Sequence, residues 1–169
     1  MREILFRGKR IDNGEWVYGD LIQLHNQRNF IINNKFGACI DDKGNFINTE
    51  SPFVCEVIPE TIGQHTGLTA NGTKIFEGDI LRYGFIYDYN CYLESLEHPE
   101  EYDNEVYDQD IEVSAVEWCS DCDYPAFDLA DHNFECNGLS QIMCGDYECE
   151  IIGNITDNPE LLKERDNDE

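Results

Sequence analysis

Glycine-containing turns between short apolar runs are the strongest constraint on the fold of this chain, and they are densest between residues 58 and 83. Thr66-Gly67-Leu68, Asn71-Gly72-Thr73 and Gly78-Asp79 each place a glycine where the chain has to bend, and the last directly precedes Ile80-Leu81. Glycine adopts positive φ without steric cost, so it is common in tight turns. The stretch therefore predicts a bend, a turn and the entry into a strand.

Short extended segments separated by turn signals continue on both sides of this stretch. Asp12-Asn13-Gly14 is a hairpin turn signal, which is typical of antiparallel strands. Strands are predicted at 3–10, 15–24, 53–58, 79–87, 111–119, 127–130 and 147–152. Asn158-Pro159 predicts the start of a short C-terminal helix. We therefore expect a mainly β protein with a minor α component.

Acidic residues are concentrated in the second half of the chain. The 169 residues carry a formal net charge of −25, and residues 83–162 contain 21 Asp and Glu but no Lys or Arg. Residues 1–82, in contrast, contain 9 Lys and Arg and 11 Asp and Glu. A field of this sign repels nucleic-acid phosphates and attracts cationic molecules. We expect a basic protein partner and no direct binding to nucleic acid.

The segment 88–110 is rich in acidic residues and poor in aliphatic ones, which indicates a solvated insertion. We expect its carboxylates to form an acidic binding surface. The predicted residues are Glu94, Glu97, Glu100, Glu101, Asp103, Glu105, Asp108 and Asp110.

The eight cysteines leave the metal and redox state of the chain open. No apolar run is long enough to span a membrane or to act as a signal peptide, so we expect a cytoplasmic protein with reduced thiols. Cys119 and Cys122 have the spacing of half a zinc site, which His132 and Cys136 would complete. Unliganded thiols are the simpler interpretation. Zinc is therefore kept as an alternative, and no other cofactor is predicted.

No catalytic signature occurs in the chain. The motifs G-x-S-x-G, H-E-x-x-H and G-x-G-x-x-G and the P-loop are all missing. His65 is the one candidate for a general base, but the sequence identifies no group that would orient it. We predict no catalytic residue.

Four segments together resemble the YopX family of phage and prophage proteins. They run from Met1 to Gly8, from Gln64 to Leu68, from Asn71 to Leu81 and from Ile151 to Leu162. The resemblance covers residues 1–24, 57–83, parts of 111–129 and 147–162. It implies a small, mostly β protein of phage origin in a bacterial host cell, from a family without an established activity. The resemblance also implies that the His65 ring packs or stacks. The motif residues with an expected structural role are Gly67, Gly72, Gly78, Asp79, Gly153 and Pro159.

The segment from Glu77 to Leu81 is also similar to the opening strand of SH3-like barrels. We expect an N-terminal β region at 1–58 and an SH3-like, partly open barrel at 59–162. The barrel would be interrupted by the insertion at 88–110, and residues 163–169 would form a frayed tail.

The charge distribution favours a non-enzymatic phage accessory protein that binds a basic host or phage protein through its acidic half. One sharper version is a DNA mimic that occupies a nucleic-acid-binding site. Two alternatives stay open. The first is a structural, oligomeric β module in which an aromatic strand at 83–89 pairs between subunits. The second is a zinc protein built on the Cys and His cluster.

Overall fold

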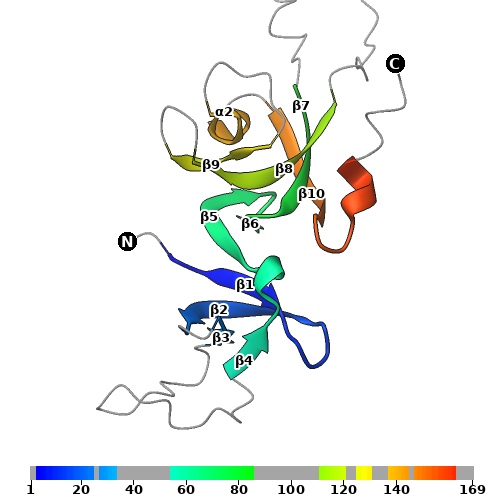
Figure 1. Ribbon diagram of the computed structural model, residues 1–169. Coiled ribbons are helices and arrows are strands. Elements are labelled where there is room, and N and C mark those ends of the chain that lie inside the picture. The colour runs from blue at the N-terminus through cyan, green and yellow to red at the C-terminus, as the bar shows by residue number, and fades with distance from the viewer. Residues whose placement is uncertain are drawn as a thin grey trace, which may run out of the picture. The chain divides into compact units, whose positions relative to one another are not determined.

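The computed structural model describes residues 3–24, 27–33, 54–85, 111–120, 125–130, 137–144 and 147–162 (Figure 1). The chain forms two compact units. The first comprises Met1–Thr69 and Lys74–Gly78, and the second comprises Ala70–Thr73 and Asp79–Glu169. The predicted boundary lay between residues 58 and 59. In the structure, residues 59–69 and Lys74–Gly78 also belong to the first unit.

A six-stranded sheet with the order β4-β3-β2-β1-β5-β6 builds the first unit (Figure 1). Antiparallel pairing joins β1 to β2, β2 to β3 and β3 to β4, as expected for strands connected by short turns. The elements are β1 (Phe6–Lys9), β2 (Trp16–Gln23), β3 (Asn29–Ile32), β4 (Val54–Val57), the 3₁₀ helix η2 (Pro59–Thr61), β5 (Gly63–Ala70) and β6 (Thr73–Phe76).

The end of β4 returns to the end of β1. Arg10 and Val57 form an isolated bridge, and the Ile58 N–H donates to the Lys9 carbonyl oxygen at 2.8 Å. The Lys9 N–H donates in turn to the Thr61 hydroxyl at 2.8 Å. These bonds fix η2 on β1, and they position β5, which follows directly.

Two glycines are required by the local geometry of the first sheet. At Gly19, a Cβ atom would lie 1.9 Å from the Ile32 carbonyl oxygen, so β2 and β3 approach each other in a way that only glycine permits. At the β5–β6 turn, Asn71 and Gly72 both have positive φ, at 48° and 79°. Two successive residues of this kind are typical of a tight two-residue hairpin.

A four-stranded antiparallel sheet with the order β10-β7-β8-β9 forms the second unit (Figure 1). Its strands are β7 (Asp79–Phe85), β8 (Glu112–Cys119), β9 (Ala126–Leu129) and β10 (Tyr147–Asn154). The helix α2 (Gly138–Cys144) lies between β9 and β10 in the chain, and the 3₁₀ helix η5 (Pro159–Leu162) follows β10.

The core of the second unit is made by aliphatic side chains from three strands and from α2. The buried residues are Ile80, Leu81, Val116, Leu129, Leu139 and Ile142. Full burial of such a side chain contributes about 1.5–3 kcal/mol. The sheet and α2 are therefore stabilised mainly by the removal of apolar surface from water.

Two side chains cap the start of α2. The Asn137 side-chain oxygen accepts the Ser140 N–H at 2.7 Å, and the Asp128 carboxylate accepts the Leu139 N–H at 3.1 Å. The first N–H groups of a helix have no partner within the helix, so these acceptors stabilise its N-terminus. Because Asp128 belongs to β9, its bond also ties the helix to the sheet.

The mainly β prediction is confirmed, and the predicted C-terminal helix is present as η5. The described strands of the second unit form an open sheet, so an SH3-like barrel stays a prediction. The insertion at 88–110 and the tail at 163–169 lie outside the described residues. None of the helices in the described segments is long and apolar enough to cross a membrane.

Gly19→Ala is expected to lower the free energy of unfolding by about 3 kcal/mol, because the new methyl group would collide with the backbone of β3. The matched control is Gly72→Ala, where no atom lies within 4 Å of the new Cβ. This control carries only the positive-φ cost of about 1 kcal/mol. Urea unfolding curves measure both values. An equal loss in the two variants would contradict the close approach of β2 and β3.

Candidate functional site

Uncompensated negative charge distinguishes the second unit from the first. Among the described residues of the second unit, eight are acidic and Arg82 is the only Lys or Arg. The acidic residues are Asp79, Glu112, Glu117, Asp128, Glu148, Glu150, Asp157 and Glu160. Asp79 and Asp128 are buried, whereas the other six are exposed or half-buried. The unit therefore presents carboxylates to solvent with little positive charge to balance them.

Arg82, the only arginine in the described part of this unit, is already engaged. Arg82 on β7 forms an ion pair with Glu150, which is its cross-strand partner on β10. Both side chains are largely exposed, and an ion pair of this kind contributes at most about 1 kcal/mol. The pair neutralises one carboxylate of the second unit.

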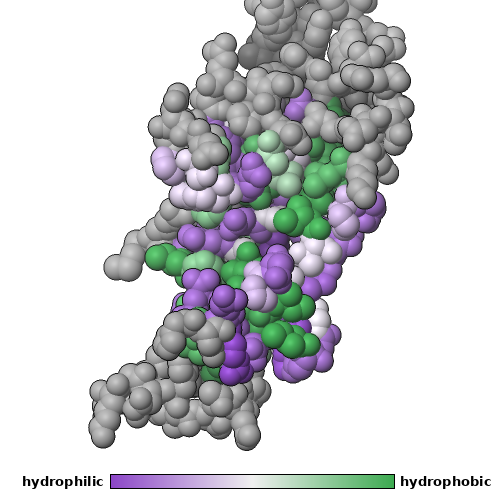
Figure 2. Space-filling model, in the orientation of Figure 1, coloured by the Kyte–Doolittle hydropathy of each residue, from purple (hydrophilic) through white to green (hydrophobic). Residues whose placement is uncertain are grey.

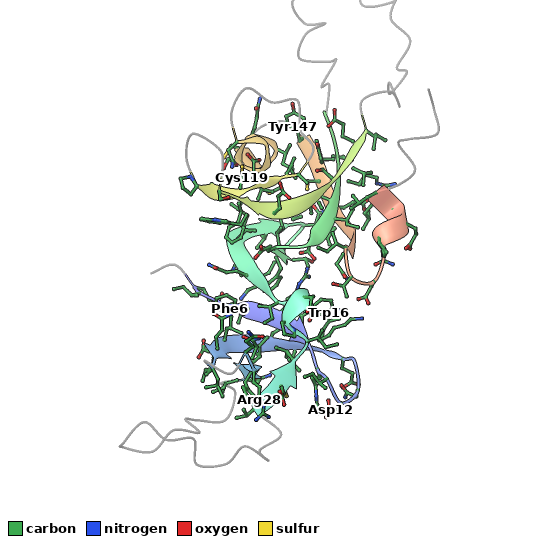
Figure 3. All side chains as sticks on the ribbon, in the orientation of Figure 1. Phe6, Asp12, Trp16, Arg28, Cys119 and Tyr147 are labelled. Carbon is green, nitrogen blue, oxygen red and sulfur yellow. The ribbon has the colours of Figure 1, made fainter. Side chains whose placement is uncertain are left out.

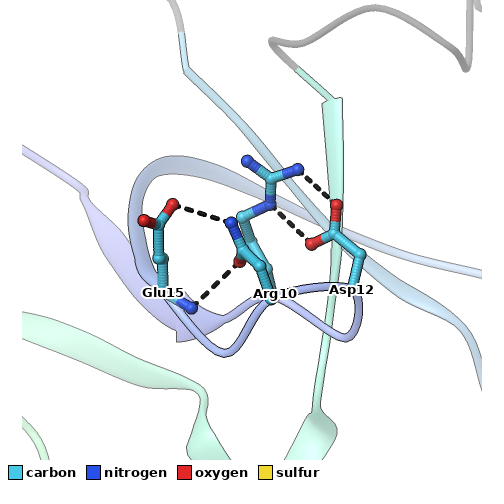
Figure 4. Close-up of polar contacts among 4 residues, drawn as sticks. Arg10, Asp12 and Glu15 are labelled. Carbon is cyan, nitrogen blue, oxygen red and sulfur yellow. Dashed lines mark hydrogen bonds and ion pairs between the residues drawn. The ribbon is translucent and has the colours of Figure 1, made fainter.

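In the first unit, three ion pairs bring acids and bases together. They are Arg10–Asp12 at 2.5 Å, Arg28–Glu56 at 2.7 Å and Lys74–Glu3 at 2.5 Å. In each pair, the hydrogen bond from the cation lowers the pKa of the carboxyl. Figure 4 shows the two-point contact of Arg10 with Asp12 and the neighbouring contact of Asn13 with Glu15. Each of these ion pairs brings one cation and one carboxylate of the first unit together, so their charges compensate each other.

Arg7 and Lys9, the other cations in the described part of the first unit, lie over aromatic rings. The Arg7 guanidinium carbon lies 4.9 Å from the centroid of the Trp16 ring and 5.1 Å from that of Phe76. The Lys9 ammonium lies 5.5 Å from the Trp16 centroid. Register pairing of Arg7 with Tyr18 and of Lys9 with Trp16 places all four side chains on one face of β1 and β2. Trp16 is labelled in Figure 3.

The second unit has an exposed aromatic residue of its own. Trp118 on β8 is 49% exposed and packs edge to face against its cross-strand partner Phe127, with ring centroids 5.1 Å apart. The Asn137 side-chain amide donates to the Phe127 carbonyl oxygen at 2.8 Å, which fixes β9 at this position. The second unit thus combines a surface tryptophan with an excess of carboxylates.

His65 is buried in the first unit as part of a packed aromatic group. Its ring lies 5.4 Å from that of Phe76, and its Nε2 donates to the Leu68 carbonyl oxygen at 3.2 Å. The buried Nδ1 atom has no hydrogen-bond partner among the described residues. This environment matches the packing or stacking predicted for the ring.

The model of the YopX protein family matches residues 5–163, which is nearly the whole chain. The chain belongs to the YopX protein family. Comparison with curated proteins gives no match.

The motif residues of the YopX resemblance lie in turns, at the starts of elements and within strands. Gly67 is inside β5 and Gly153 is inside β10, so Gly67 is not in a turn between strands. Gly67, Gly72 and Gly78 have φ values of 92°, 79° and 81°. Asp79 is buried at the start of β7. At Gly153, a Cβ atom would lie 2.7 Å from the Asn158 side-chain oxygen, and Pro159 is the first residue of η5. These positions are consistent with the structural role expected for the YopX motif.

Most of the predicted site residues of this YopX protein lie outside the described residues. The eight acids from Glu94 to Asp110 are all in this group, as are Cys122, His132 and Cys136. Cys119 is described and is disulfide-bonded, so zinc binding by its thiolate would require the reduced form. Within the described residues, no group of three His, Cys, Asp or Glu side chains could hold a metal ion. The acidic surface at 88–110 and the zinc site stay predictions.

The sequence did not reveal the role of Asp128 or the helix that it caps. The signal was present in Asn137, a common capping residue, and in Leu139 and Ile142, which are spaced for one helix face. A helix of only seven residues gives too short a pattern to separate from a loop.

Asp128→Ala is expected to lower the free energy of unfolding by about 2 kcal/mol, because the buried Leu139 N–H would lose its acceptor. Asp128→Asn keeps an acceptor oxygen and should lose less. The matched control is Glu117→Ala, at the exposed cross-strand neighbour of Asp128, which should change stability by less than about 0.5 kcal/mol. Thermal or urea unfolding measures the three variants. A loss in Asp128→Ala no larger than that of the control would contradict the capping role.

Cys149 is expected to resist alkylation, because its thiol pKa is raised to about 11. Burial is the larger cause of this shift, and the negative charge of Glu150 is the smaller one. At pH 8 only about one thiol in a thousand would then be deprotonated, and the thiolate is the reactive form. Cys144 is exposed and serves as the internal control. Iodoacetamide labelling followed by peptide mass spectrometry should show Cys144 modified first. Equal labelling rates in the folded protein would contradict the shift, whereas unfolded protein should label at both sites.

Proposed function

We propose that this YopX family member is a phage or prophage accessory protein that acts without catalysis by binding a basic protein through the acidic surface of its second unit. The observation that carries the proposal is the separation of charge along the chain. Residues 83–162 hold 21 acidic residues without Lys or Arg. A surface of one sign steers an oppositely charged partner and raises its rate of association.

The contrast between the units supports a binding role for the second one in particular. The described cations of the first unit lie beside carboxylates or over aromatic rings, so they interact within the unit. In the described part of the second unit, Arg82 pairs with Glu150 and leaves exposed acids such as Glu117, Glu148 and Glu160 unbalanced. Repulsion between like charges at a surface destabilises the folded unit. A role in binding a basic partner would account for the excess of acidic residues despite this cost.

A sharper version of the proposal is a DNA mimic, in which the carboxylates stand in for backbone phosphates at a nucleic-acid-binding site. The acids predicted to form the surface at 88–110 would contribute to it. Competition distinguishes this version from general acidic binding. A mimic should displace duplex DNA from its partner, whereas a binder at another basic surface should leave the DNA bound.

The test compares capture of host proteins by the wild-type chain and by two variants of equal net charge. Glu117→Gln with Glu148→Gln and Glu160→Gln neutralises exposed acids of the second unit. The matched control neutralises exposed acids of the first unit through Glu15→Gln, Asp20→Asn and Glu60→Gln. We expect the captured proteins to be basic and to elute as the salt concentration rises from about 0.1 M to 1 M, where the Debye length falls from about 10 Å to 3 Å.

The second-unit variant should release its partner at a lower salt concentration than the wild type, and the control variant should behave like the wild type. Partners that are neutral or acidic and indifferent to salt would contradict the proposal. Equal behaviour of the two variants would remove the second unit as the binding surface.

The two alternatives from the sequence remain predictions with separate tests. An oligomeric β module requires self-association, and sedimentation at micromolar concentration would reveal it. A zinc protein requires stoichiometric metal in elemental analysis of the reduced chain.

A further inference from the structure

An aromatic pair at one end of the four-stranded sheet extends the apolar interior of the second unit to its surface. Trp118 and Phe127 are cross-strand partners, and the next pair on the same face, Val116 and Leu129, is fully buried. Trp118 is nearly half exposed, although it belongs to this row. The tryptophan ring is therefore held by the sheet on one side and open to solvent on the other.

The positions next to this pair are fixed on both strands. Phe127 is bonded through its carbonyl oxygen to the Asn137 side chain, and the adjacent Asp128 binds the start of α2. On β8, Cys119 follows Trp118 and is disulfide-bonded; Figure 3 labels it at the end of the strand. The ring is thus presented by an ordered part of the sheet, which limits the entropy lost when a ligand binds.

In the first unit, two half-buried aromatic rings lie next to cations of the same chain. Arg7 and Lys9 lie over Trp16, and Arg28 lies 4.9 Å from the centroid of the Phe30 ring. The face of an aromatic ring carries partial negative charge, and tryptophan binds cations best among the aromatic residues. Trp16 and Phe30 of the first unit are thus engaged in cation–π contacts within the chain.

The second unit offers no equivalent cation among its described residues. Arg82 is the only Lys or Arg there, and it pairs with Glu150. No Lys or Arg in the described part of this unit lies over Trp118. The excess of acidic residues in the described part of this unit favours the approach of positive charge and disfavours that of negative charge.

We propose that Trp118, supported by Phe127, receives an arginine side chain of the partner and anchors it on the acidic surface. This inference rests on the proposed function and adds the residue at which recognition is centred. Arginine fits better than lysine, because its planar guanidinium stacks on an aromatic face and gives up its hydration more readily. The carboxylates attract the partner over a distance, and the ring selects a guanidinium at contact.

The test uses short synthetic peptides of equal length in which serine alternates with arginine, lysine or neutral citrulline. Isothermal titration at low salt measures their affinity for the wild-type chain and for Trp118→Leu, which keeps an apolar side chain but removes the ring. The matched control is Tyr18→Leu. Tyr18 is 45% exposed on a strand of the first unit and packs edge to face on Phe76, so it resembles Trp118 in exposure and support.

We expect the arginine peptide to bind more tightly than the lysine peptide, and the citrulline peptide not to bind. Trp118→Leu should bind the arginine peptide about fivefold more weakly, the factor that corresponds to about 1 kcal/mol of cation–π attraction. Tyr18→Leu should bind like the wild type. Trp118→Phe keeps a ring, so it should show an intermediate affinity, and it replaces Trp118→Leu if the leucine variant fails to fold.

Different results separate this inference from the proposed function. If the arginine peptide binds the wild type and Trp118→Leu equally, the anchor is wrong and the acidic surface alone explains binding. If the wild type binds no basic peptide at low salt, both proposals fail. The chain has two tryptophans, so Trp16→Phe leaves Trp118 as the sole tryptophan reporter. A shift of its fluorescence with protein concentration alone would show that a second copy covers the ring, which would also overturn the inference.

Discussion

Burial of aliphatic side chains across the four-stranded sheet holds the second unit together against repulsion among its carboxylates. Ile80, Leu81, Val116 and Leu129 are almost inaccessible to solvent, and each contributes about 1.5–3 kcal/mol. Surface charges interact weakly through water, at about 1 kcal/mol per pair even at 4 Å. The unit can therefore keep six of its eight described acids outside the core, where they cost little stability.

The buried carboxylate of Asp128 follows a different rule from the surface acids. Burial of a charge is unfavourable unless hydrogen bonds compensate for it. Asp128 accepts the backbone N–H groups of Leu129 and Leu139, so it serves the attachment of α2 to β9. The same attachment orders the strand that carries Phe127. The bond from Asp128 thus holds α2 on β9, and Phe127 on the same strand supports the exposed Trp118 ring.

The sequence predicted much of the fold because its turns are marked by residues with distinct backbone preferences. Gly72 and Gly78 were recognisable as turn positions, and both have positive φ. The boundary between the units was harder to predict, because only the short turn at Glu77-Gly78 separates β6 from β7. The assignment of β5 and β6 to the first sheet depends on strand pairing, which the sequence does not show. The engagement of Arg7 with two rings likewise depends on the register of β1 and β2, which composition cannot supply.

We propose that binding takes place on the second unit, because its charge is unbalanced and its exposed tryptophan has no cation of its own within the described residues. Amide hydrogen exchange of the full chain, with and without a saturating arginine–serine peptide, shows which unit binds the peptide. We expect slower exchange in β8 and β9, around Trp118 and Phe127, and unchanged exchange in β1 to β4. Protection confined to the first unit would contradict this proposal.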